Sequence, residues 1–273
     1  MSRRYLSASA YRGFAAQLME RDLDALKHVS DLRFVSGSQL TRLCFTDSDD
    51  LDANARAARR ALLRLVRLGA LARLPRPVGG IRSGSAGFVY QLGPAGQRLA
   101  LERGWQPERR RRRSLTPGTL FVAHALQVSE LHTLLVEADR SRRFELLELT
   151  GEPACWRSYG GIAGQRQTLK PDSYVSLGLG PYEDSYFIEV DRGTEGSRAL
   201  ERQLRLYVAY YASGQEQTER GVFPRVLWLA PDERRTSVIE DCVRQLPGAA
   251  RKLFHVALFN QALAAIQATD ATG

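Results

Sequence analysis

The sequence predicts an α/β protein of two domains, for three reasons. Its 273 residues exceed the usual size of a single domain. The second half alternates helical and strand patterns, which is typical of helices packed on a central sheet. The charge is also unevenly divided, since residues 1–118 carry 22 Lys and Arg against 10 Asp and Glu, and residues 119–273 carry 17 against 20. A basic excess confined to the first half indicates that this half binds a polyanion.

The composition excludes several classes of protein. Apolar residues make up 44% of the chain, which allows a sizeable core. We expect no membrane span and no secretory signal, because no stretch reads as a long uncharged apolar run. Cys44, Cys155 and Cys242 form no CxxC pair, which argues against a disulfide framework or a zinc site and fits a reducing cytoplasm. No glycine-rich phosphate loop or HExxH motif occurs.

Residues 20–105 have the pattern of three helices followed by two short strands. Leu23, Leu26 and Val29 lie at helical spacing, and Ser36 or Ser38 can cap the next helix. An acidic loop then precedes an arginine-rich helix that ends at Gly69. The expected order is helix 21–29, helix 38–45, helix 53–68, strand 70–77, a Gly/Ser/Arg loop 78–87, strand 88–92 and helix 94–104.

This order predicts a winged helix-turn-helix whose third helix enters the DNA major groove. Leu62 and Leu65 lie along one side of that helix, and arginines recur at three- and four-residue steps on another. A winged helix used only for protein contact, with a solvated arginine face, is the alternative. The residues predicted to bind DNA are Arg42, Asn54, Arg56, Arg59, Arg60, Arg64, Arg82 and Ser83.

The basic run Arg109 to Arg113 indicates an inter-domain linker over residues 106–118. The second domain, residues 119–265, follows as an α/β layer with a central mixed sheet. Its expected elements are helix 119–140, strands 144–150, 169–177 and 186–190, helix 197–213, strand 225–230, helix 236–246 and strand 255–259.

Two of these strands carry acids where buried strands are normally apolar. Glu189 and Asp191 are two residues apart and therefore point to the same side of their strand. If strands 169–177 and 186–190 pair as a hairpin, Asp172 joins them. Three adjacent carboxylates repel one another unless a cation or a proton lies between them. The cluster is therefore either a Mg²⁺ site of the nuclease type or a strand end whose acids cap turns and pair with arginines.

The order of elements, with Pro-Asp on one strand and acid-x-acid on the next, resembles the PD-(D/E)xK nuclease fold. That resemblance implies metal ligation by Asp172 and Glu189, and a further acid at Glu130. Asp191 stands at the position of the family's lysine, and arginine, which stays protonated, cannot replace that lysine as a general base. The following helix offers only Arg198, Arg202 and Arg205.

The whole chain resembles a narrower group, the replication-relaxation family of bacterial plasmids and integrated elements. The resemblance covers roughly residues 20–260 and rests on HALQVSELHTLL, KPDSYVSL, FIEVDRGTE and LRLYVAYY. Its most specific piece is EVDRGTE, residues 189–195. Members usually carry a lysine shortly before the tyrosine of the following helix, where this chain has Gln203. The resemblance implies a DNA-binding protein concerned with replication, transfer or transcriptional control of a mobile element.

The sequence is therefore consistent with three functions. The first is a double-stranded-DNA-binding regulator whose nuclease-like domain no longer cuts and serves dimer or partner contact. The second is a Mg²⁺-dependent endonuclease or nickase that uses Asp172, Glu189 and Asp191 as catalytic metal ligands. The third is a protein-only adaptor. The expected partners are double-stranded DNA, a second copy of the chain and a protein bound by the second domain. No cofactor is expected for DNA binding, and the expected location is the cytoplasm.

Overall fold

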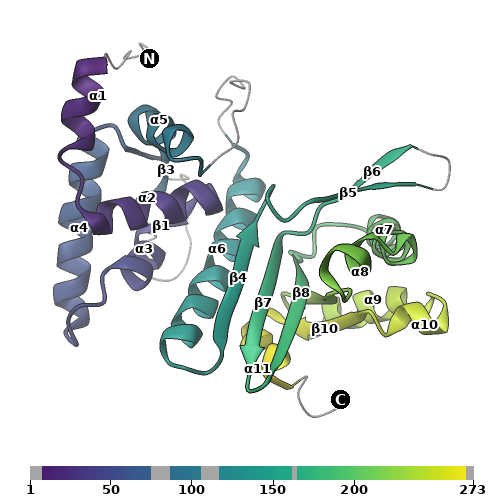
Figure 1. Cartoon of the computed structure of the whole chain (residues 1–273). Coiled ribbons are helices and arrows are strands. Elements are labelled where there is room, and N and C mark those ends of the chain that lie inside the picture. Colours follow the sequence, from purple (N-terminus) through teal and green to yellow (C-terminus); the bar gives the residue numbers. More distant parts are fainter. Residues whose placement is uncertain (1–7, 75–86, 106–116, 162–164, 269–273) are drawn as a thin grey trace. The chain divides into compact units, whose positions relative to one another are not determined.

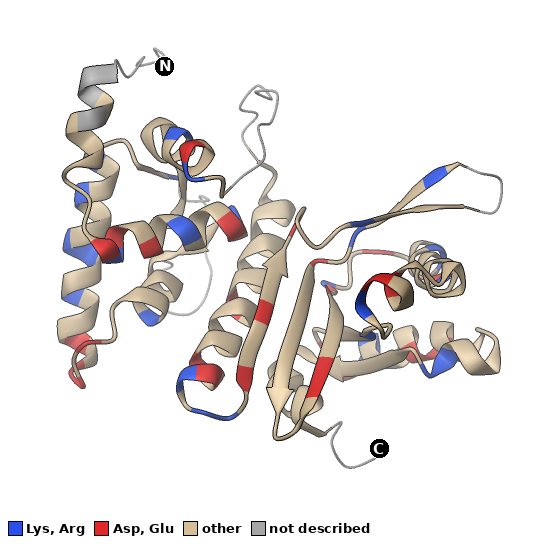
Figure 2. Ribbon diagram, in the orientation of Figure 1, with Lys and Arg blue, Asp and Glu red and all other residues tan. Residues whose placement is uncertain are grey.

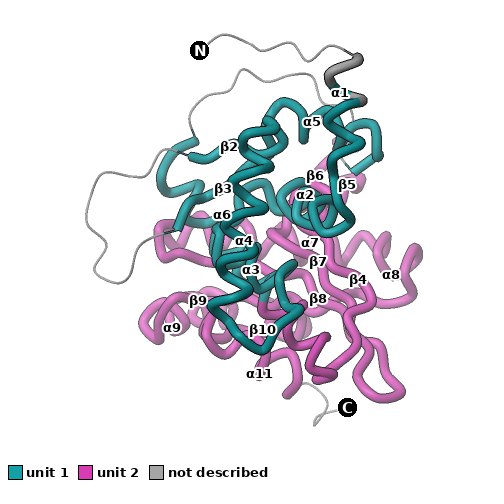
Figure 3. Tube along the Cα trace, turned by 90° about the vertical axis from the view of Figure 1, so that its left-hand side faces the viewer, with its two compact units in different colours: residues 1–133 teal, residues 134–273 magenta. Residues whose placement is uncertain are grey.

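The computed structural model describes residues 8–74, 87–105, 117–161 and 165–268 (Figure 1). The chain divides into two compact units, residues 1–133 and residues 134–273 (Figure 3). The division falls inside helix α6 (Thr119–Arg140). The linker predicted at residues 106–118 lies almost wholly outside the described residues, so that boundary stays a prediction.

Unit 1 consists of helices around a small antiparallel sheet of strand order β1-β3-β2. The helices and strands follow one another in the predicted order, with two additions. Helix α1 lies before the expected elements, and residues between the expected helices 21–29 and 38–45 form a short strand, β1, which pairs with β3. The elements are α1 (Ala8–Ala15), α2 (Glu20–Leu32), β1 (Val35–Ser36), α3 (Gly37–Cys44), α4 (Leu51–Arg67), β2 (Leu71–Arg73), β3 (Val89–Leu92) and α5 (Pro94–Glu102).

Side-chain caps fix where α3 and α4 begin. The Ser36 hydroxyl accepts a hydrogen bond from the Gln39 N–H at 3.2 Å, and the Gln39 side-chain oxygen accepts one from the Ser36 N–H at 2.9 Å. The Asp50 carboxylate accepts from the Asp52 N–H at 2.8 Å, so α4 begins at Leu51, two residues earlier than predicted. Gly69, with a φ of 73°, follows its end as expected.

The start of α5 lies directly against the backbone that follows α4. The Gly93 N–H donates to the Ala70 carbonyl at 2.8 Å, and the Ala95 N–H donates to the Gly69 carbonyl at 3.0 Å. A Cβ atom added to Gly96 would lie 2.2 Å from the Ala70 carbonyl oxygen. This close approach of two backbones requires glycine at position 96.

Unit 2 contains a five-stranded sheet of order β10-β9-β8-β7-β4. Strands β4, β7 and β8 pair antiparallel, whereas β8, β9 and β10 are parallel, so the predicted α/β class with a central mixed sheet is confirmed. The elements around this sheet are β4 (Glu145–Gly151), β7 (Ser173–Leu179), β8 (Tyr182–Val190), α7 (Ser197–Ser213), α8 (Gln215–Arg220), β9 (Arg225–Ala230), α9 (Glu233–Arg244), α10 (Gly248–Arg251), β10 (Phe254–Leu258), a 3₁₀ turn (Phe259–Gln261) and α11 (Ala262–Gln267).

The strand predicted over 169–177, with a start or bulge expected at Pro171, is divided at that residue. Its first residue belongs to β6 (Arg166–Leu169), which pairs with β5 (Arg157–Gly160) in a separate two-stranded sheet that was not predicted. The chain then leaves that hairpin and enters the central sheet as β7. Pro171 lies at the break, where its missing N–H interrupts the ladder. Helix α8 was not predicted either.

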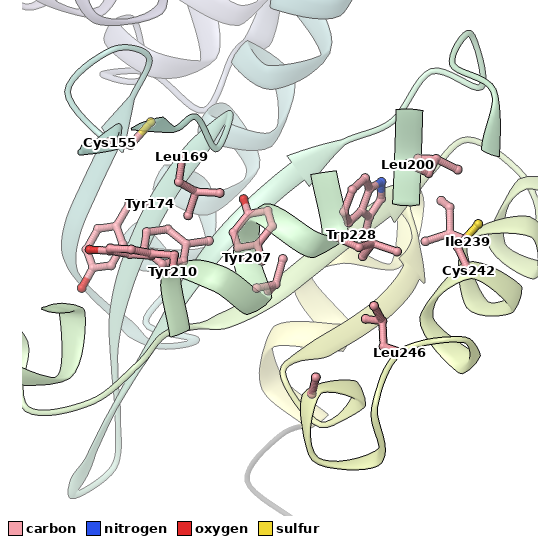
Figure 4. Close-up of a cluster of buried hydrophobic side chains, with 14 of the residues drawn as sticks. Cys155, Leu169, Tyr174, Leu200, Tyr207, Tyr210, Trp228, Ile239, Cys242 and Leu246 are labelled. Atoms are coloured by element: carbon pink, nitrogen blue, oxygen red, sulfur yellow. The ribbon is translucent and has the colours of Figure 1, made fainter. Parts of the chain in front are cut away.

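The main core of unit 2 lies between the sheet and helices α7 and α9 (Figure 4). Leu200, Leu204, Tyr207 and Tyr211 recur at helical spacing, which predicts that they lie on one side of α7, and the first three are buried. Tyr211 was predicted to lie with them, but its exposed fraction is 43% and Tyr210 is buried instead. Steps of three and four residues both satisfy helical periodicity, so only packing on the sheet distinguishes the two tyrosines.

In the described part of the chain, α6 alone has the length and composition of a membrane span, which corrects the expectation that no stretch is apolar enough. One such helix is weak evidence, because the core helix of a soluble protein passes the same test. The Ser129 hydroxyl of α6 donates to the Phe34 carbonyl at 2.7 Å, and the Glu130 carboxylate pairs with Arg42 of α3, so polar side chains of this helix have partners inside the protein.

We expect Gly96→Ala to destabilise the protein by about 1–3 kcal/mol, because the new methyl group meets backbone that cannot move aside. Helix propensity alone predicts the opposite sign, since alanine is favoured over glycine by about 1 kcal/mol in a helix. The free energy of unfolding from urea titration measures the difference. Gly13→Ala in α1 is the matched control, because an added Cβ there meets nothing within 4 Å. Equal effects of the two substitutions would contradict the close approach.

Candidate functional site

Helix α4 separates apolar and basic residues onto different sides. Ala58, Leu62 and Leu65 are buried in unit 1, with exposed fractions of 2% or less. Four arginines on the remaining surface are exposed, and several of them are visible along α4 in Figure 2. We call them the arginine face; they are Arg56, Arg59, Arg60 and Arg67. Arg56 lies 3.3 Å from the Asp50 carboxylate, and the Arg59 Nε donates to the Ala55 carbonyl, so these side chains are held close to the helix.

Two other residues predicted to bind DNA have internal roles in unit 1. The Asn54 side chain is buried and donates to the Ser48 carbonyl at 2.7 Å, which ties the preceding loop to α4. Arg64 donates two hydrogen bonds, at 2.6 and 2.7 Å, to the carboxylate of Asp22 on α2. Asp22 is only 3% exposed, so Arg64 neutralises a buried charge. Both side chains therefore lie outside the arginine face.

Arg42 on α3 also has an internal partner. Its guanidinium pairs with the Glu130 carboxylate at 2.5 Å, and the Gln39 side-chain N–H donates to the same carboxylate at 3.0 Å. Glu130, which the nuclease resemblance implied as a further acid, thus serves as the partner of α3 in unit 1. Arg82 and Ser83, predicted as phosphate contacts of the wing, lie outside the described residues.

Unit 2 brings Asp172 and Glu189 together, as the sequence predicted. The Asp172 N–H donates to the Ile188 carbonyl at 3.1 Å, and the Asp172 carboxylate accepts from the Val190 N–H at 2.7 Å. These bonds hold Asp172 across from Glu189 of β8. We call Asp172, Glu189 and the α7 residues Gln203 and Tyr207 the acidic corner. The Tyr207 hydroxyl donates to Glu189 at 2.5 Å, and the Gln203 side chain also hydrogen-bonds Glu189.

The acidic corner is excluded from water. Asp172 is 8% exposed and Glu189 5%. Burial, followed by the neighbouring Asp172 charge, raises the pKa of Glu189 well above its ordinary value. Burial and the Glu189 charge raise the pKa of Tyr207 as well. The pKa of the nearby Cys155 thiol is raised by burial and by Glu152, and this thiol donates to the Pro171 carbonyl at 3.0 Å. Cys155 is therefore an inert thiol.

Asp191 does not complete the predicted trio. Strand β8 ends at Val190, and the Asp191 carboxylate accepts two hydrogen bonds from the Arg235 guanidinium of α9, at 3.0 and 2.8 Å. Both side chains are largely buried, with exposed fractions of 6% and 11%. Across the described ranges, no group of three or more His, Cys, Asp and Glu side chains is placed to hold a metal ion.

Sequence reasoning missed the donors that bind these acids. Tyr207 was assigned to the core, and Arg235 was given no role. Gln203 and Tyr207 are four residues apart, so they lie on the same side of α7. The sequence did hold a signal for these donors. Two hydrogen-bonding side chains lie on the inner side of the helix that directly follows a buried strand with an acid in it. The sequence held no comparable signal for the long-range pair of Asp191 with Arg235.

We expect Glu189→Gln to change how stability depends on pH. Because the folded state raises the pKa of Glu189, its contribution to stability is fully present below the unfolded pKa, near 4.5, and is lost as pH rises through the folded pKa. Glutamine keeps the acceptor for Tyr207 and cannot ionise. The melting temperature of the variant should therefore match the wild type near pH 4.5 and exceed it increasingly toward pH 8.

Thermal melts over this pH range measure the effect. Glu195→Gln is the matched control, because Glu195 is exposed and its removal should leave the pH dependence as in the wild type. A difference between wild type and Glu189→Gln that stays constant with pH would show that Glu189 is ionised in the fold.

A family model described as replication-relaxation matches residues 26–226. No curated protein and no solved structure matches the chain. The matched range is well over half of the sequence and includes α4 with its arginine face, both strands of the acidic corner, and α7. Membership of this family suggests a role in the replication or transfer of a plasmid or other mobile element. The chain belongs to the replication-relaxation family.

Proposed function

We propose that this protein binds double-stranded DNA through the arginine face of α4, as part of a winged helix-turn-helix module over residues 20–105. In the same proposal, the second domain is a nuclease-like scaffold that does not cut and that serves contact with a second copy or a protein partner. The setting is replication, transfer or transcriptional control of a mobile element. The exposure of four arginines on one helix, whose other side is buried, is the observation that carries the proposal.

The order of elements in unit 1 supports a winged module. Helices α2, α3 and α4 are followed by the antiparallel strands β2 and β3, with the residues between those strands at the place of a wing. In such modules the third helix reads the major groove. The arginine face belongs to that third helix. Arginines that project from a recognition helix bind phosphates and guanine edges.

The order of elements around the acidic corner supports a nuclease-like scaffold. Helix α6 is followed by β4, β7 and β8 of the central sheet, with the β5–β6 hairpin inserted between β4 and β7, and α7 and α8 then connect β8 to the parallel strand β9. Apart from the inserted hairpin and the short helix α8, this is the α-β-β-β-α-β order of the PD-(D/E)xK resemblance. Pro171 and Asp172 precede β7, and Glu189 lies near the end of β8, as that resemblance also implied.

The contacts of the acidic corner do not fit a Mg²⁺ site. A hard divalent cation requires several carboxylate oxygens that are free to turn toward it. Glu189 accepts hydrogen bonds from Tyr207 and Gln203, and Asp172 accepts one from the Val190 N–H. The third acid, Asp191, is held by Arg235. The lysine that would activate water is replaced by Asp191. These contacts favour a structural role for the acids.

We expect the triple variant Arg56→Ala, Arg59→Ala, Arg60→Ala to lose most of its affinity for duplex DNA. If each arginine neutralises one phosphate, the slope of log K against log salt concentration should fall by about 3, since each contact contributes about 0.9. Fluorescence anisotropy of a labelled duplex, titrated at several salt concentrations, measures both quantities. Unchanged affinity in this variant would refute DNA binding by α4, whereas a wild-type protein with no salt-sensitive affinity for DNA would leave the protein-only adaptor.

The matched control removes three exposed arginines from unit 2, as Arg202→Ala, Arg205→Ala, Arg234→Ala. It has the same net charge as the α4 variant and should bind DNA almost as the wild type does. Glu189→Gln should also bind normally, because the acidic corner is buried and has no part in the proposed DNA contact.

The second candidate function is the Mg²⁺-dependent endonuclease or nickase, favoured by the proximity of Asp172 and Glu189. We expect supercoiled plasmid incubated with the protein and Mg²⁺ or Mn²⁺ to remain supercoiled, because the acids already have partners and Asp191 stands at the position of the family's lysine. The topological forms are separated on an agarose gel. Nicking that disappears in both Asp172→Asn and Glu189→Gln would overturn the non-enzymatic proposal and establish the nuclease.

A further inference from the structure

A groove of about 630 Å³ opens on unit 2, away from the acidic corner. It is lined by the C-terminal half of α9, by Arg225 at the start of β9 and by residues 251–256, which include the first part of β10. Four cationic side chains line it against a single carboxylate, that of Glu240. The cationic residues are Arg225, Arg244, Arg251 and Lys252.

The four cations differ in how far they are already neutralised. Arg244 pairs with Asp241 and lies 4.0 Å from Glu240, so its charge is largely offset. The Arg251 Nε donates to the Leu246 carbonyl at 2.8 Å, a neutral contact that positions the guanidinium and leaves its charge. Arg225 and Lys252 are exposed, and the structure gives neither an ion pair with any residue it describes. The lining therefore carries a net positive charge.

The remaining lining is uncharged at neutral pH. Val243, Phe254 and Val256 supply apolar surface. Burial, and then the charge of Arg225, lower the pKa of His255, so this imidazole is neutral and can offer a hydrogen bond. The groove thus combines exposed cations with less exposed apolar surface and a neutral hydrogen-bond donor. Such a lining suits a ligand that has both anionic groups and a less polar sugar part.

We propose that this groove binds the phosphodiester backbone of DNA, as a second contact of the chain with the same polymer. A free nucleotide has related chemistry, and a cavity of this volume is large enough for one. The exposure of all four cationic side chains favours the polymer. Charge presented at the surface can follow a backbone, whereas sites for small ligands bury most of the ligand.

The groove is structurally independent of the acidic corner. In the parallel pair of β8 and β9, Tyr186 lies opposite Arg225 and Glu189 lies opposite Trp228. Arg225 is therefore three positions along the strand from the partner of Glu189, about 10 Å at 3.3 Å per residue. A ligand in the groove therefore contacts the start of β9, away from Trp228, the residue that lies opposite Glu189. This inference rests on the proposed function in one respect, namely that the ligand is DNA.

The test compares full-length variants by anisotropy of a labelled random-sequence duplex at several salt concentrations. Arg225→Glu with Lys252→Glu reverses the two charges of the groove that form no ion pair within the described chain. We expect affinity to fall at least about tenfold and the salt slope to decrease by about 2. Arg202→Glu with Arg234→Glu is the matched control, which changes net charge equally on exposed residues of the same unit and should bind as the wild type does.

The outcomes separate this inference from the proposed function. If the groove variant binds DNA as the wild type does while the α4 variant does not, the groove inference is overturned and the proposed function stands. If only the groove variant loses binding, the inference stands and the role of α4 fails. Binding of ATP that the groove variant abolishes, without any change in DNA affinity, would replace the polymer by a free nucleotide. Arg251→Ala, with its melting temperature as a folding check, provides a second groove variant.

Discussion

Burial of Glu189 in the central sheet is the constraint on which unit 2 depends. A carboxylate removed from water must be protonated or surrounded by donors, because an uncompensated buried charge costs several kcal/mol. Tyr207 and Gln203 of α7 supply those donors, so the acid fixes the rotation of the helix on the sheet. The same rotation buries Tyr210 and leaves Tyr211 exposed. A residue type associated with catalysis thus acts here in packing.

Unit 1 uses its arginines in two ways. Arg64 and Arg42 pair with Asp22 and Glu130, and these pairs join helices within the unit. Among the described residues, the arginine face makes only local contacts and is exposed, so its charge is available to a polyanion. Ion pairs within the unit therefore offset part of the positive charge of the first half of the chain.

The family assignment and the geometry constrain function in different ways. Membership of the replication-relaxation family suggests a role in the replication or transfer of a plasmid or other mobile element. The geometry offers an exposed basic helix and a cationic groove in separate units, and an acidic corner whose oxygens are already bound. The two proposals taken together, DNA held at α4 and at the groove without cleavage, would account for all three features.

The sequence by itself determined the strongly periodic elements, such as α4 and α7, and the juxtaposition of Asp172 with Glu189, because helical spacing, strand alternation and a tight turn are local properties. It also carried the family resemblance through the segment 189–195. Only the tertiary structure decided which arginines are exposed, that Pro171 separates two sheets, and that Asp191 turns to Arg235. Those outcomes depend on partners far away along the chain, and no local pattern encodes the geometry of a contact between residues 44 positions apart.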